Sequence, residues 1–486
     1  MAGSVQTPPG FNLQPSAERV PVASNYITNF DFLNQYLPDT YEKEFERYGN
    51  RTISGFLRMV GAEMPTNSDL IKWAEQGRLH TKYTNVTTTQ APGAISTAVT
   101  WTVGDALVPA GTVTTGGDGG IAIRIGQTVF ITDNAAGSGL SNKGIVTDVD
   151  YTLGTFNVRY YEANQNVPDT TACTVMIYGS EFKKGTNGML NSLEADDFIF
   201  ENKPVILKDK YAVSGSDMAQ IGWIEVTTEN GATGYLWYMK SEHETRLRFD
   251  DYLETAMIEA VPAAVGSGAA AELGVPNAVV GSAQGAGSEG IFYAVENRGN
   301  LWSGGIPSAL ADFDAIISRL DKQGAIEENV LFVNREMSFD IDDMLAAQNS
   351  YGAGGTSYGL FDNDEQMALN LGFTGFRRGY DFYKSDWKYL NDPTMRGNLT
   401  NGVINGLLVP AGSTTVYDQV LGKNAKRPFL HVRYRASETE DRRYKTWITG
   451  SAGGAATSDL DAMEVNYLSE RAVCVMGANN FFLFKD

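Results

Sequence analysis

The chain has 486 residues, and its composition is that of a folded protein with an acidic surface. Hydrophobic residues make up 42% and charged residues 20%, which excludes a disordered, collagen-like or coiled-coil chain. A net charge of -20, from 58 acidic and 38 basic residues, disfavours a dedicated DNA-binding or lipid-binding protein. At about 150 residues per domain, the length predicts roughly three compact units, or one large domain with an insertion.

The residue types present narrow the possible fold class and exclude several kinds of site. The many Gly, Tyr and Phe residues favour short strands joined by turns. The only cysteines, Cys173 and Cys474, cannot build a disulfide framework or a four-cysteine metal site. The start of the chain lacks the basic and apolar regions of a signal peptide, and there is no apolar run of about 18 residues. We therefore expect neither an exported nor a membrane-spanning protein.

The N-terminal region predicts an arm followed by short helices. Residues 1–25 carry four prolines among small and polar residues, which favours an extended segment that needs a neighbour to become ordered. From Phe30 to Gly77 apolar residues fall at helical spacing, as Tyr41, Phe45 and Tyr48 do. We expect a helix over 69–76, capped by Asn67 or Ser68 and ended by Gly77.

A block rich in Thr, Gly and Val, residues 85–175, has the character of an inserted subdomain. Its β-rich runs predict a small barrel or sandwich. The runs are Ile121–Thr132, Gly144–Asp150, Thr155–Tyr161 and Thr171–Tyr178. Asp148, Asp150 and Thr152 lack the further acidic ligands of a calcium loop, so we interpret them as a hairpin turn. Beyond the block, Lys203–Ser214 and Ile221–Thr228 are expected to pair as a long projecting hairpin.

The stretch Tyr235–Ala260 predicts the longest helix, about 39 Å, because it contains no Gly or Pro and Pro262 follows it. Residues 263–290 are small and predict a loose connection. Further on, the pattern predicts a helix, a strand, a second helix and a flexible loop, and then strands that tie the C-terminus into a sheet. These elements are Pro307–Gly324, Asn329–Asn334, Ser338–Gln348, Ser350–Gly359 and the strands within Gly372–Asp486, which end in Ala472–Phe484.

No residue set predicts catalysis, metal binding or a cofactor. His80, His243 and His431 lie far apart and lack the short spacing of zinc ligands. Carboxylate pairs such as Asp250 with Asp251 and Asp342 with Asp343 are expected in so acidic a chain, and we interpret them as surface residues.

Two stretches predict a subunit interface. Phe373–Leu390 interleaves aromatic and basic residues, which could bind bases or sugars, but which we favour as a contact with a neighbouring subunit. Lys423–Lys445 holds eight basic and three acidic residues, a local charge of +5 that suggests pairing between copies. The candidate interface residues are Phe376, Arg377, Arg378, Tyr380, Trp387, Arg427, Arg433, Arg435, Arg442 and Arg443.

The order of these parts resembles a known family. An arm, a long hairpin, a long helix, an α/β subdomain and a returning C-terminal sheet are similar to the major capsid proteins of tailed bacteriophages, which share the phage Hong Kong ninety-seven fold. The residue pattern of three segments further resembles the capsid proteins of the crAss-like phages. The segments are Phe313–Asp343, Gly372–Met395 and Tyr417–Trp447. The resemblance covers most of the chain but rests on order and texture, because the family has no short diagnostic motif. The block at 85–175 departs from the minimal pattern.

The resemblance implies an α+β fold with an inserted all-β subdomain. It implies the following parts: an arm with short helices (1–67), a helix and connector (68–84), the insertion (85–175), an extended loop (176–234), the spine helix of a peripheral domain (235–262), a linker (263–290), an axial domain (291–406) and the C-terminal peripheral strands (407–486). The implied function is a structural, non-enzymatic subunit. It would assemble into pentamers and hexamers of an icosahedral head that encloses double-stranded DNA without reading its sequence.

Partners follow from the same resemblance. They are further copies of the chain, a separate scaffolding protein, a portal, and accessory or head-fibre proteins, with no membrane and no cofactor involved. The location implied is the virion shell, assembled in the host cytoplasm. The aromatic segment and the 85–175 block leave an alternative open, a β-rich carbohydrate-binding or adhesive protein of a virion or surface. A glycan-acting enzyme is a third hypothesis, for which no acid/base pair is evident.

Overall fold

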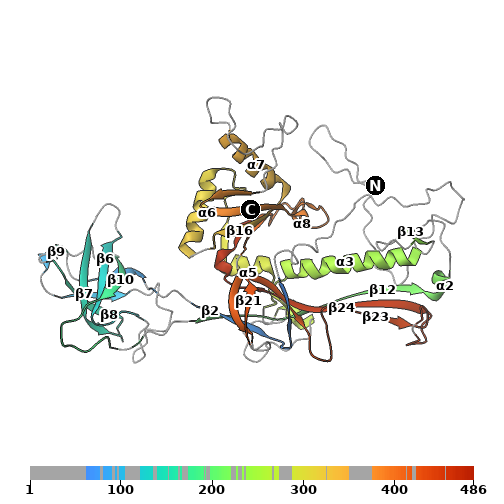
Figure 1. Cartoon of the computed structure of the whole chain (residues 1–486), viewed down its shortest axis with the longest axis horizontal. Coiled ribbons are helices and arrows are strands. Elements are labelled where there is room, and N and C mark those ends of the chain that lie inside the picture. Colours follow the sequence, from blue (N-terminus) through green and yellow to red (C-terminus); the bar gives the residue numbers. More distant parts are fainter. Residues whose placement is uncertain are drawn as a thin grey trace. The chain divides into compact units, whose positions relative to one another are not determined.

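The computed structural model (Figure 1) is of mixed α+β character and divides into two compact units. We call Met1–Trp73 with Phe200–Asp486 the main unit and Ala74–Ile199 the inserted unit. The structure describes residues 62–76, 80, 82–89, 94–95, 98–103, 121–134, 140–151, 153–162, 165–166, 173–190, 192, 197–219, 226–227, 233–234, 237–264, 267–272, 287–323, 326–349, 375–411, 413–418, 423–454 and 456–485. The predicted arm, the helical pattern before residue 62 and the predicted loop at 350–359 lie outside these ranges.

The inserted unit is a closed barrel in the strand order β10-β3-β5-β8-β7-β6, one of the two arrangements expected for this block. Its strands are β3 Lys82–Thr87, β5 Val99–Val103, β6 Gln127–Asp133, β7 Ser141–Asp150, β8 Thr155–Tyr160 and β10 Cys173–Ser180, with a small ladder of β4 Ala94–Ile95 and β9 Gln165–Asn166. Alternate side chains, led by Trp101 and Tyr83, fill the interior. The unit extends beyond the predicted 85–175 at both ends.

The predicted hairpin turn between β7 and β8 is confirmed. The Asp150 carboxylate accepts the backbone N–H of Leu153 at 3.1 Å. Gly154 follows with φ of 64°, a conformation that glycine adopts without strain. The acidic residues here therefore shape a turn.

The helix predicted over 69–76 is wrong, because this segment is β2, Ile71–Gln76, in a two-stranded sheet with β11, Asp197–Asn202. Ile71 is buried and Lys72 exposed, while Trp73 lies 6.3 Å from the ring of Phe200. This alternation has the period of two that belongs to a strand. Ser68 accepts the N–H of Leu70 at 3.2 Å, which makes a turn and not a helix cap.

The main unit contains a long sheet in the order β1-β22-β24-β12, with β23 also paired to β24. Its strands are β1 Ala62–Thr66, β12 Val205–Ser214, β22 Leu430–Arg435, β23 Lys445–Gly450 and β24 Ala462–Val475. β24 pairs with β12 along one edge and with β22 and β23 along the other. The predicted hairpin of 203–214 with 221–228 is therefore wrong. The described part of that second segment, β13 Val226–Thr227, pairs with β14 Thr233–Gly234.

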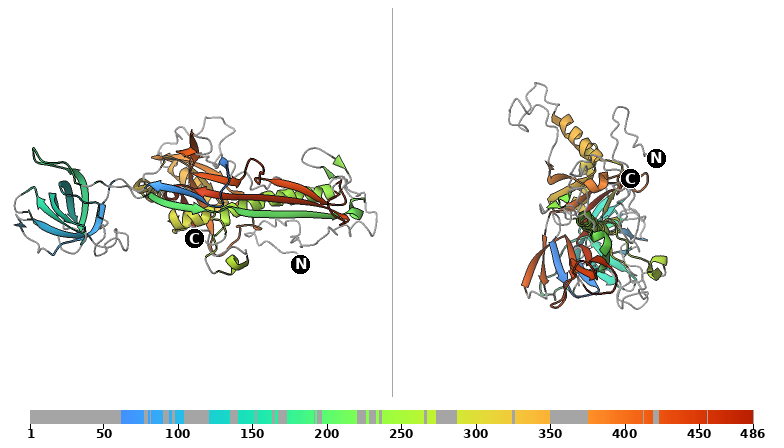
Figure 2. Two further views of the ribbon diagram at one scale, coloured as in Figure 1. Left: turned by 90° about the horizontal axis from the view of Figure 1, so that it is seen from below. Right: turned by 90° about the vertical axis from the view of Figure 1, so that its right-hand side faces the viewer.

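The predicted long helix is confirmed as α3, Trp237–Glu259. It lies along one face of the long sheet, as Figure 2 shows. Phe249 and Leu253 of α3 pack against Tyr211 of β12 and against Val465 and Tyr467 of β24. Since burial of apolar surface contributes more than helix propensity in a folded chain, this contact fixes the helix on the sheet.

A second sheet in the main unit has the order β15-β25-β19-β16-β18-β17. Its strands are β15 Asn300–Trp302, β16 Glu328–Val333, β17 Gly375–Arg378, β18 Tyr380–Asp386, β19 Ile404–Pro410 and β25 Phe482–Lys485. The expected strand at 329–334 and the paired C-terminus are confirmed. β25 brings the end of the chain between β15 and β19.

Alternation along β16 separates two cores. Leu331 and Val333 face a cluster formed with α6, Leu310–Gln323, and α7, Arg335–Asn349. Phe332 faces a second cluster formed with α5, Ile291–Arg298, and α8, Lys388–Asn391. The second cluster includes side chains of β22 and β24, so it joins the two sheets of the main unit. The helices expected over 307–324 and 338–348 are thus confirmed.

Short elements complete the described chain. They are α2 Gly215–Met218, α4 Gly268–Glu272, the hairpin β20 Ser413–Asp418 with β21 Lys423–Pro428, and the 3-10 turn η3 Ala478–Asn480. α4 lies within the stretch predicted as a loose connection, most of which is outside the described residues. None of the helices in the described ranges combines the length and apolarity needed to cross a bilayer.

A buried asparagine joins the end of β11 to the long sheet. The Asn202 amide donates to the carbonyls of Glu289 at 2.9 Å and Val473 at 2.6 Å. Its Oδ1 accepts the N–H groups of Lys203 at 2.8 Å and Glu289 at 2.7 Å. All four contacts are to backbone groups, so one side chain satisfies polar atoms of three segments that would otherwise be buried without partners.

Removing the ring that fixes α3 should destabilise the main unit. For Phe249→Ala we expect a loss of about 3–5 kcal/mol in the free energy of unfolding, because the side chain is fully buried and leaves a cavity. The matched control is Tyr252→Ala on the same helix, where the side chain is half exposed and the expected loss is smaller, about 0.5 kcal/mol. Urea unfolding followed by circular dichroism measures both. Equal losses would contradict the packing described.

Acid should weaken one contact across the β12–β24 ladder. Lys210 Nζ donates to Glu464 Oε1 at 2.7 Å, and this hydrogen bond lowers the pKa of Glu464. A lowered folded pKa gives a contribution to stability that is present above the unfolded pKa and lost as the pH falls through the folded value. We expect Glu464→Gln and Lys210→Met to flatten the acid side of the stability profile by similar, small amounts. Denaturant unfolding between about pH 3 and 7 tests this, and an unchanged profile in either variant would contradict it.

Candidate functional site

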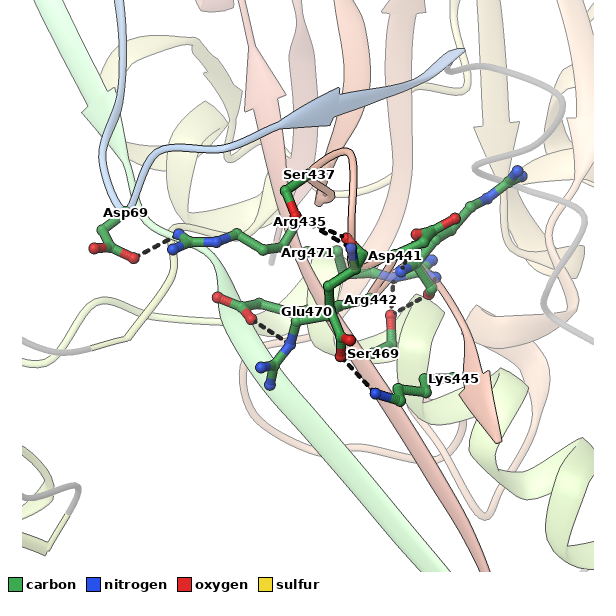
Figure 3. A network of polar contacts seen from close by, with 11 residues as sticks. Asp69, Arg435, Ser437, Asp441, Arg442, Lys445, Ser469, Glu470 and Arg471 are labelled. Atoms are coloured by element: carbon green, nitrogen blue, oxygen red, sulfur yellow. Dashed lines mark hydrogen bonds and ion pairs between the residues drawn. The ribbon is translucent and has the colours of Figure 1, made fainter. Parts of the chain in front are cut away.

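The candidate site is a charged surface of the main unit where β1 lies beside β22 (Figure 3). β1 pairs in parallel with β22, so that Glu63 lies opposite Val432 and Thr66 opposite Arg435. This places a segment from the N-terminal part of the chain at the edge of a sheet built from its C-terminal part. The ion pairs around this edge involve Glu63, Asp69, Arg435, Arg442, Arg443, Glu470 and Arg471, and we call them the arginine network.

Glu63 is the centre of the arginine network. Its carboxylate forms an ion pair with Arg443, and its Oε1 lies 3.6 Å from Arg471 Nη1. Arg471 is nearly buried and also donates from Nη2 to the carbonyl of Arg443 at 2.9 Å and from Nε to Ser469 Oγ at 2.9 Å. A buried guanidinium is costly unless it is paired, so Glu63 meets a requirement of the long sheet itself.

Two further pairs surround this centre. Arg435 Nη1 lies 2.5 Å from Asp69 Oδ1, and Arg442 Nε lies 2.8 Å from Glu470 Oε2. Such partly exposed ion pairs each contribute only about 0–1 kcal/mol to stability, but here two of them lie on the same region of the sheet. The first pair holds the turn after β1 against β22, and the second holds the loop after β22 against β24.

The loop between β22 and β23 is closed by its own hydrogen bonds. The Ser437 N–H donates to the carbonyl of Glu440 at 2.8 Å, and the Arg442 N–H donates to that of Arg435 at 3.0 Å. Lys445 Nζ donates to Glu440 Oε1 at 2.5 Å, and this hydrogen bond lowers the pKa of the Glu440 carboxyl. The loop therefore presents its arginines from a fixed backbone.

Four of the predicted interface arginines lie in this region. Arg435, Arg442 and Arg443 form ion pairs with acids of their own chain, and Arg433 Nη1 lies 3.9 Å from Met64 Sδ. Arg427 belongs to β21, and its side chain is outside the described set. The acids that pair with Arg435, Arg442 and Arg443 lie on β1 and β24 and in the turn after β1, outside the basic stretch at 423–445. Local charge counting therefore could not reveal them.

The other predicted interface segment turns out to be divided between core and surface. Phe376 packs 5.0 Å from the ring of Phe313, and Trp387 is 5% exposed and packs against Phe332 at 6.0 Å. Tyr380 is buried and donates a hydrogen bond to Asp321 of α6, which raises the pKa of Tyr380 to about 12. These three side chains stabilise their own subunit. Tyr380 and Trp387 are buried in the single chain, and Phe376 is partly buried.

The two arginines of the same segment remain at the surface. Arg378 pairs with Asp314 of α6 through two nitrogens, and this hydrogen bonding lowers the pKa of Asp314. Arg377 is largely exposed and lies 3.2 Å from Asp381. A single chain does not test whether this segment contacts a neighbouring subunit, so the interface stays a prediction. The exposed arginines Arg377 and Arg378 are its accessible members.

A groove lies between β12 and α3. It has a volume of about 510 Å³, and Leu207, Phe249, Tyr252 and Ala256 contribute to its mostly apolar lining. Glu259 at the groove is already engaged, because it pairs with Arg396 and accepts the Tyr389 hydroxyl at 2.5 Å. Sequence patterns did not indicate this groove because it forms only where a helix crosses a distant strand.

His431 and the two cysteines lie in buried positions. In the described ranges, no group of three or more His, Cys, Asp or Glu side chains is placed to hold a metal ion. His431 is buried, with Nδ1 3.2 Å from the carbonyl of Pro428. Cys173 is buried in the inserted unit and Cys474 in the main unit.

No protein-family model matches the chain, and no curated protein matches it. The structure is similar to a chain of Microbacterium phage Oxtober96, at 8% identity and a TM-score of 0.36 over 93% of this chain and 97% of that one. It is similar to a chain in the capsid of a native GTA particle, at 9% identity and a TM-score of 0.36 over 96% and 99%. A chain in the capsid of the cyanophage P-SCSP1u matches at 10% identity and a TM-score of 0.33 over 63% and 80%. Because these TM-scores are low, we argue the function from this chain's own geometry.

The arginine network generates a test of what Glu63 does. We expect Glu63→Gln to lower the free energy of unfolding by about 1–3 kcal/mol, because it removes the countercharge of the nearly buried Arg471. Glu440→Gln removes a carboxylate whose partner Lys445 is exposed, and we expect no measurable change. Urea unfolding at low ionic strength compares the two variants. If they behave alike, the network does not hold the edge strand.

Proposed function

We propose that this chain is a structural subunit of a closed protein shell, a major capsid protein of the tailed-phage type. It would assemble into pentamers and hexamers and enclose double-stranded DNA. The observation that carries the proposal is the frame of the main unit, in which a 23-residue helix covers one face of a long sheet. Among the described strands, none pairs with the outer edge of β12, and Ile206, Lys208 and Lys210 on its opposite face are exposed.

Pairing in the sheet shows which side chains that open face carries. Tyr211 lies opposite Val465 and packs under α3, so the next pair along the strands, Lys210 and Asn466, points to the other side. Trp447 lies opposite Asn466 and shares this face. Ile206 has the same parity as Lys210 and is half exposed. An indole and an aliphatic side chain among charges are typical of a surface that another subunit covers.

The order of the elements supports the same proposal. A major capsid protein would have a spine helix, then an axial domain and then C-terminal peripheral strands. The chain has this order in α3, then α6–β16–α7, and then the strands β22 to β25. The extended loop is then the β2–β11 ribbon, in place of the hairpin expected near 203–228. The inserted unit continues this ribbon in the sequence, since its chain begins within β2 and ends within β11.

Charge supports enclosing DNA without reading it. The chain has a net charge of -20. Its most basic stretch is matched by Glu63, Asp69 and Glu470 within the same chain, which leaves less positive charge to bind phosphates. An acidic shell would contain a packed duplex without trapping it against the wall.

The carbohydrate-binding alternative loses part of its support. Phe376, Tyr380 and Trp387, the rings that suggested stacking on sugars, lie in hydrophobic clusters of the main unit. The narrower resemblance to crAss-like phages, the scaffolding, portal and head-fibre partners, the virion location and assembly in the host cytoplasm remain predictions that follow from the proposal.

Assembly is the direct test of the proposal. Full-length protein, produced together with the products of its neighbouring genes, should sediment as closed particles that negative-stain microscopy resolves as shells. We expect Trp447→Ser to keep the melting temperature and to lower the particle yield by about tenfold or more, since many copies of a weakened contact add up. The matched control is Ile448→Ser, one residue along the strand and on the other face, which should assemble normally. A monomer that never assembles, or a variant that assembles like the wild type, would contradict the proposal.

A further inference from the structure

The outer wall of the barrel carries a row of large side chains. Met176 of β10 lies opposite Phe130 of β6, and Phe130 lies opposite Lys143 of β7. The neighbouring row of Val175, Ile131 and Asn142 is buried, so the first row points outward. The barrel patch consists of Phe130, Lys143, Tyr161, Met176, Tyr178 and Glu181.

The apolar members of the barrel patch are unusually accessible. Tyr161 is 49%, Tyr178 48% and Met176 42% exposed. Single exposed apolar residues need no explanation, but neighbouring ones on one wall mark a contact surface. Tyrosine and methionine are also residue types enriched in the centres of protein interfaces.

Contacts within the barrel patch arrange it with opposite charges at its two ends. Lys143 Nζ lies 5.9 Å from the centre of the Tyr178 ring. The Tyr161 backbone N–H donates to the carbonyl of Lys143 at 3.1 Å, and its hydroxyl donates to Glu181 Oε2 at 2.6 Å. Tyr161 therefore joins the backbone of Lys143 to the Glu181 carboxylate, and its ring lies between these two residues. Rings held by such contacts lose little conformational freedom when they bind.

We propose that the barrel patch is a two-fold contact between the inserted units of two copies of this chain, in which Lys143 of each copy pairs with Glu181 of the other. A surface with a cation at one end, a carboxylate at the other and rings between them is complementary to itself after a two-fold rotation. The aromatic rings would form the dry centre of the contact and the charges its rim. This assigns a role to the inserted unit, for which the proposed shell function supplies none.

One such contact is small, so its strength would come from repetition. In an assembly that holds many copies, each barrel meets another at a high effective concentration, and weak contacts act together. In free protein the same contact should appear as a concentration-dependent dimer. The free chain is therefore the material in which the contact is measured.

Charge reversal provides the test, with sedimentation velocity of the unassembled full-length protein as the measurement. Lys143→Glu and Glu181→Lys should each weaken dimerisation by about tenfold or more. The double variant should regain wild-type association, because exchanging both ends restores complementarity. An equimolar mixture of the two single variants should also dimerise, since each supplies the charge that the other lost. Lys322→Glu on α6 is the matched control for net charge and should dimerise like the wild type.

A second variant keeps the test independent of the hydrogen bond that Glu181 makes. Tyr178→Ser leaves Lys143 and Glu181 in place and should weaken dimerisation to a similar degree, with an unchanged melting temperature. The proposal is overturned if the double variant or the mixture associates as weakly as the single variants. It is also overturned if Tyr178→Ser abolishes binding to a panel of oligosaccharides while dimerisation stays normal, which would assign the patch to sugars. Loss of shells with dimers retained would contradict the proposed function alone.

Discussion

The structure of the main unit depends on the pairing of one strand, β24. Its 14 residues form ladders with β12, β22 and β23, of which β12 comes from a distant part of the chain. Its side chains also enter three hydrophobic clusters, through Val473, Tyr467 and Cys474 respectively. A strand paired on both edges and buried on both faces has one register, because a shift by one residue would move every side chain to the wrong face. The positions of α3, of β1 and of the join to the second sheet all follow from that register.

Contacts within the chain cover some surfaces of the long sheet and leave others accessible. α3 uses one face of the long sheet, Asn202 closes the end of β11 onto β24, and Glu63 secures the edge strand β1. What remains at the surface is an open face with Trp447, a groove beside β12 and a barrel whose wall bears tyrosines. Under the proposed function, binding energy on such surfaces would be repeated in every copy of the subunit. The internal ion pairs fit this role, because they neutralise the arginines that would otherwise attract nucleic acid.

Sequence patterns predicted the parts of this structure that local forces decide. The helices α3, α6 and α7 follow from a period of 3.6 and from their stop signals, and the barrel strands follow from turn residues between β-rich runs. The helix prediction for 69–76 was wrong, because a segment this short fits the period of a helix as well as that of a strand. The strand that pairs with it, β11, lies more than a hundred residues away in the sequence. The hairpin predicted at 203–228 was wrong for the same reason, because β12 pairs with the distant strand β24. Tyr380 and Trp387, which were predicted as interface residues, are buried in the single chain. Aromatic and basic composition could not show this, because it does not tell which face of a strand meets a helix.

The central claim is that the open edge and face of the long sheet are covered by neighbouring copies. Hydrogen exchange of backbone amides in assembled and unassembled protein tests it most directly, because protection follows the burial and pairing of each strand. We predict that amides of β12 and β23 exchange at least about tenfold more slowly after assembly, whereas those of β24, already paired on both sides, change little. Equal exchange of β12 and β23 in the two states would contradict the account.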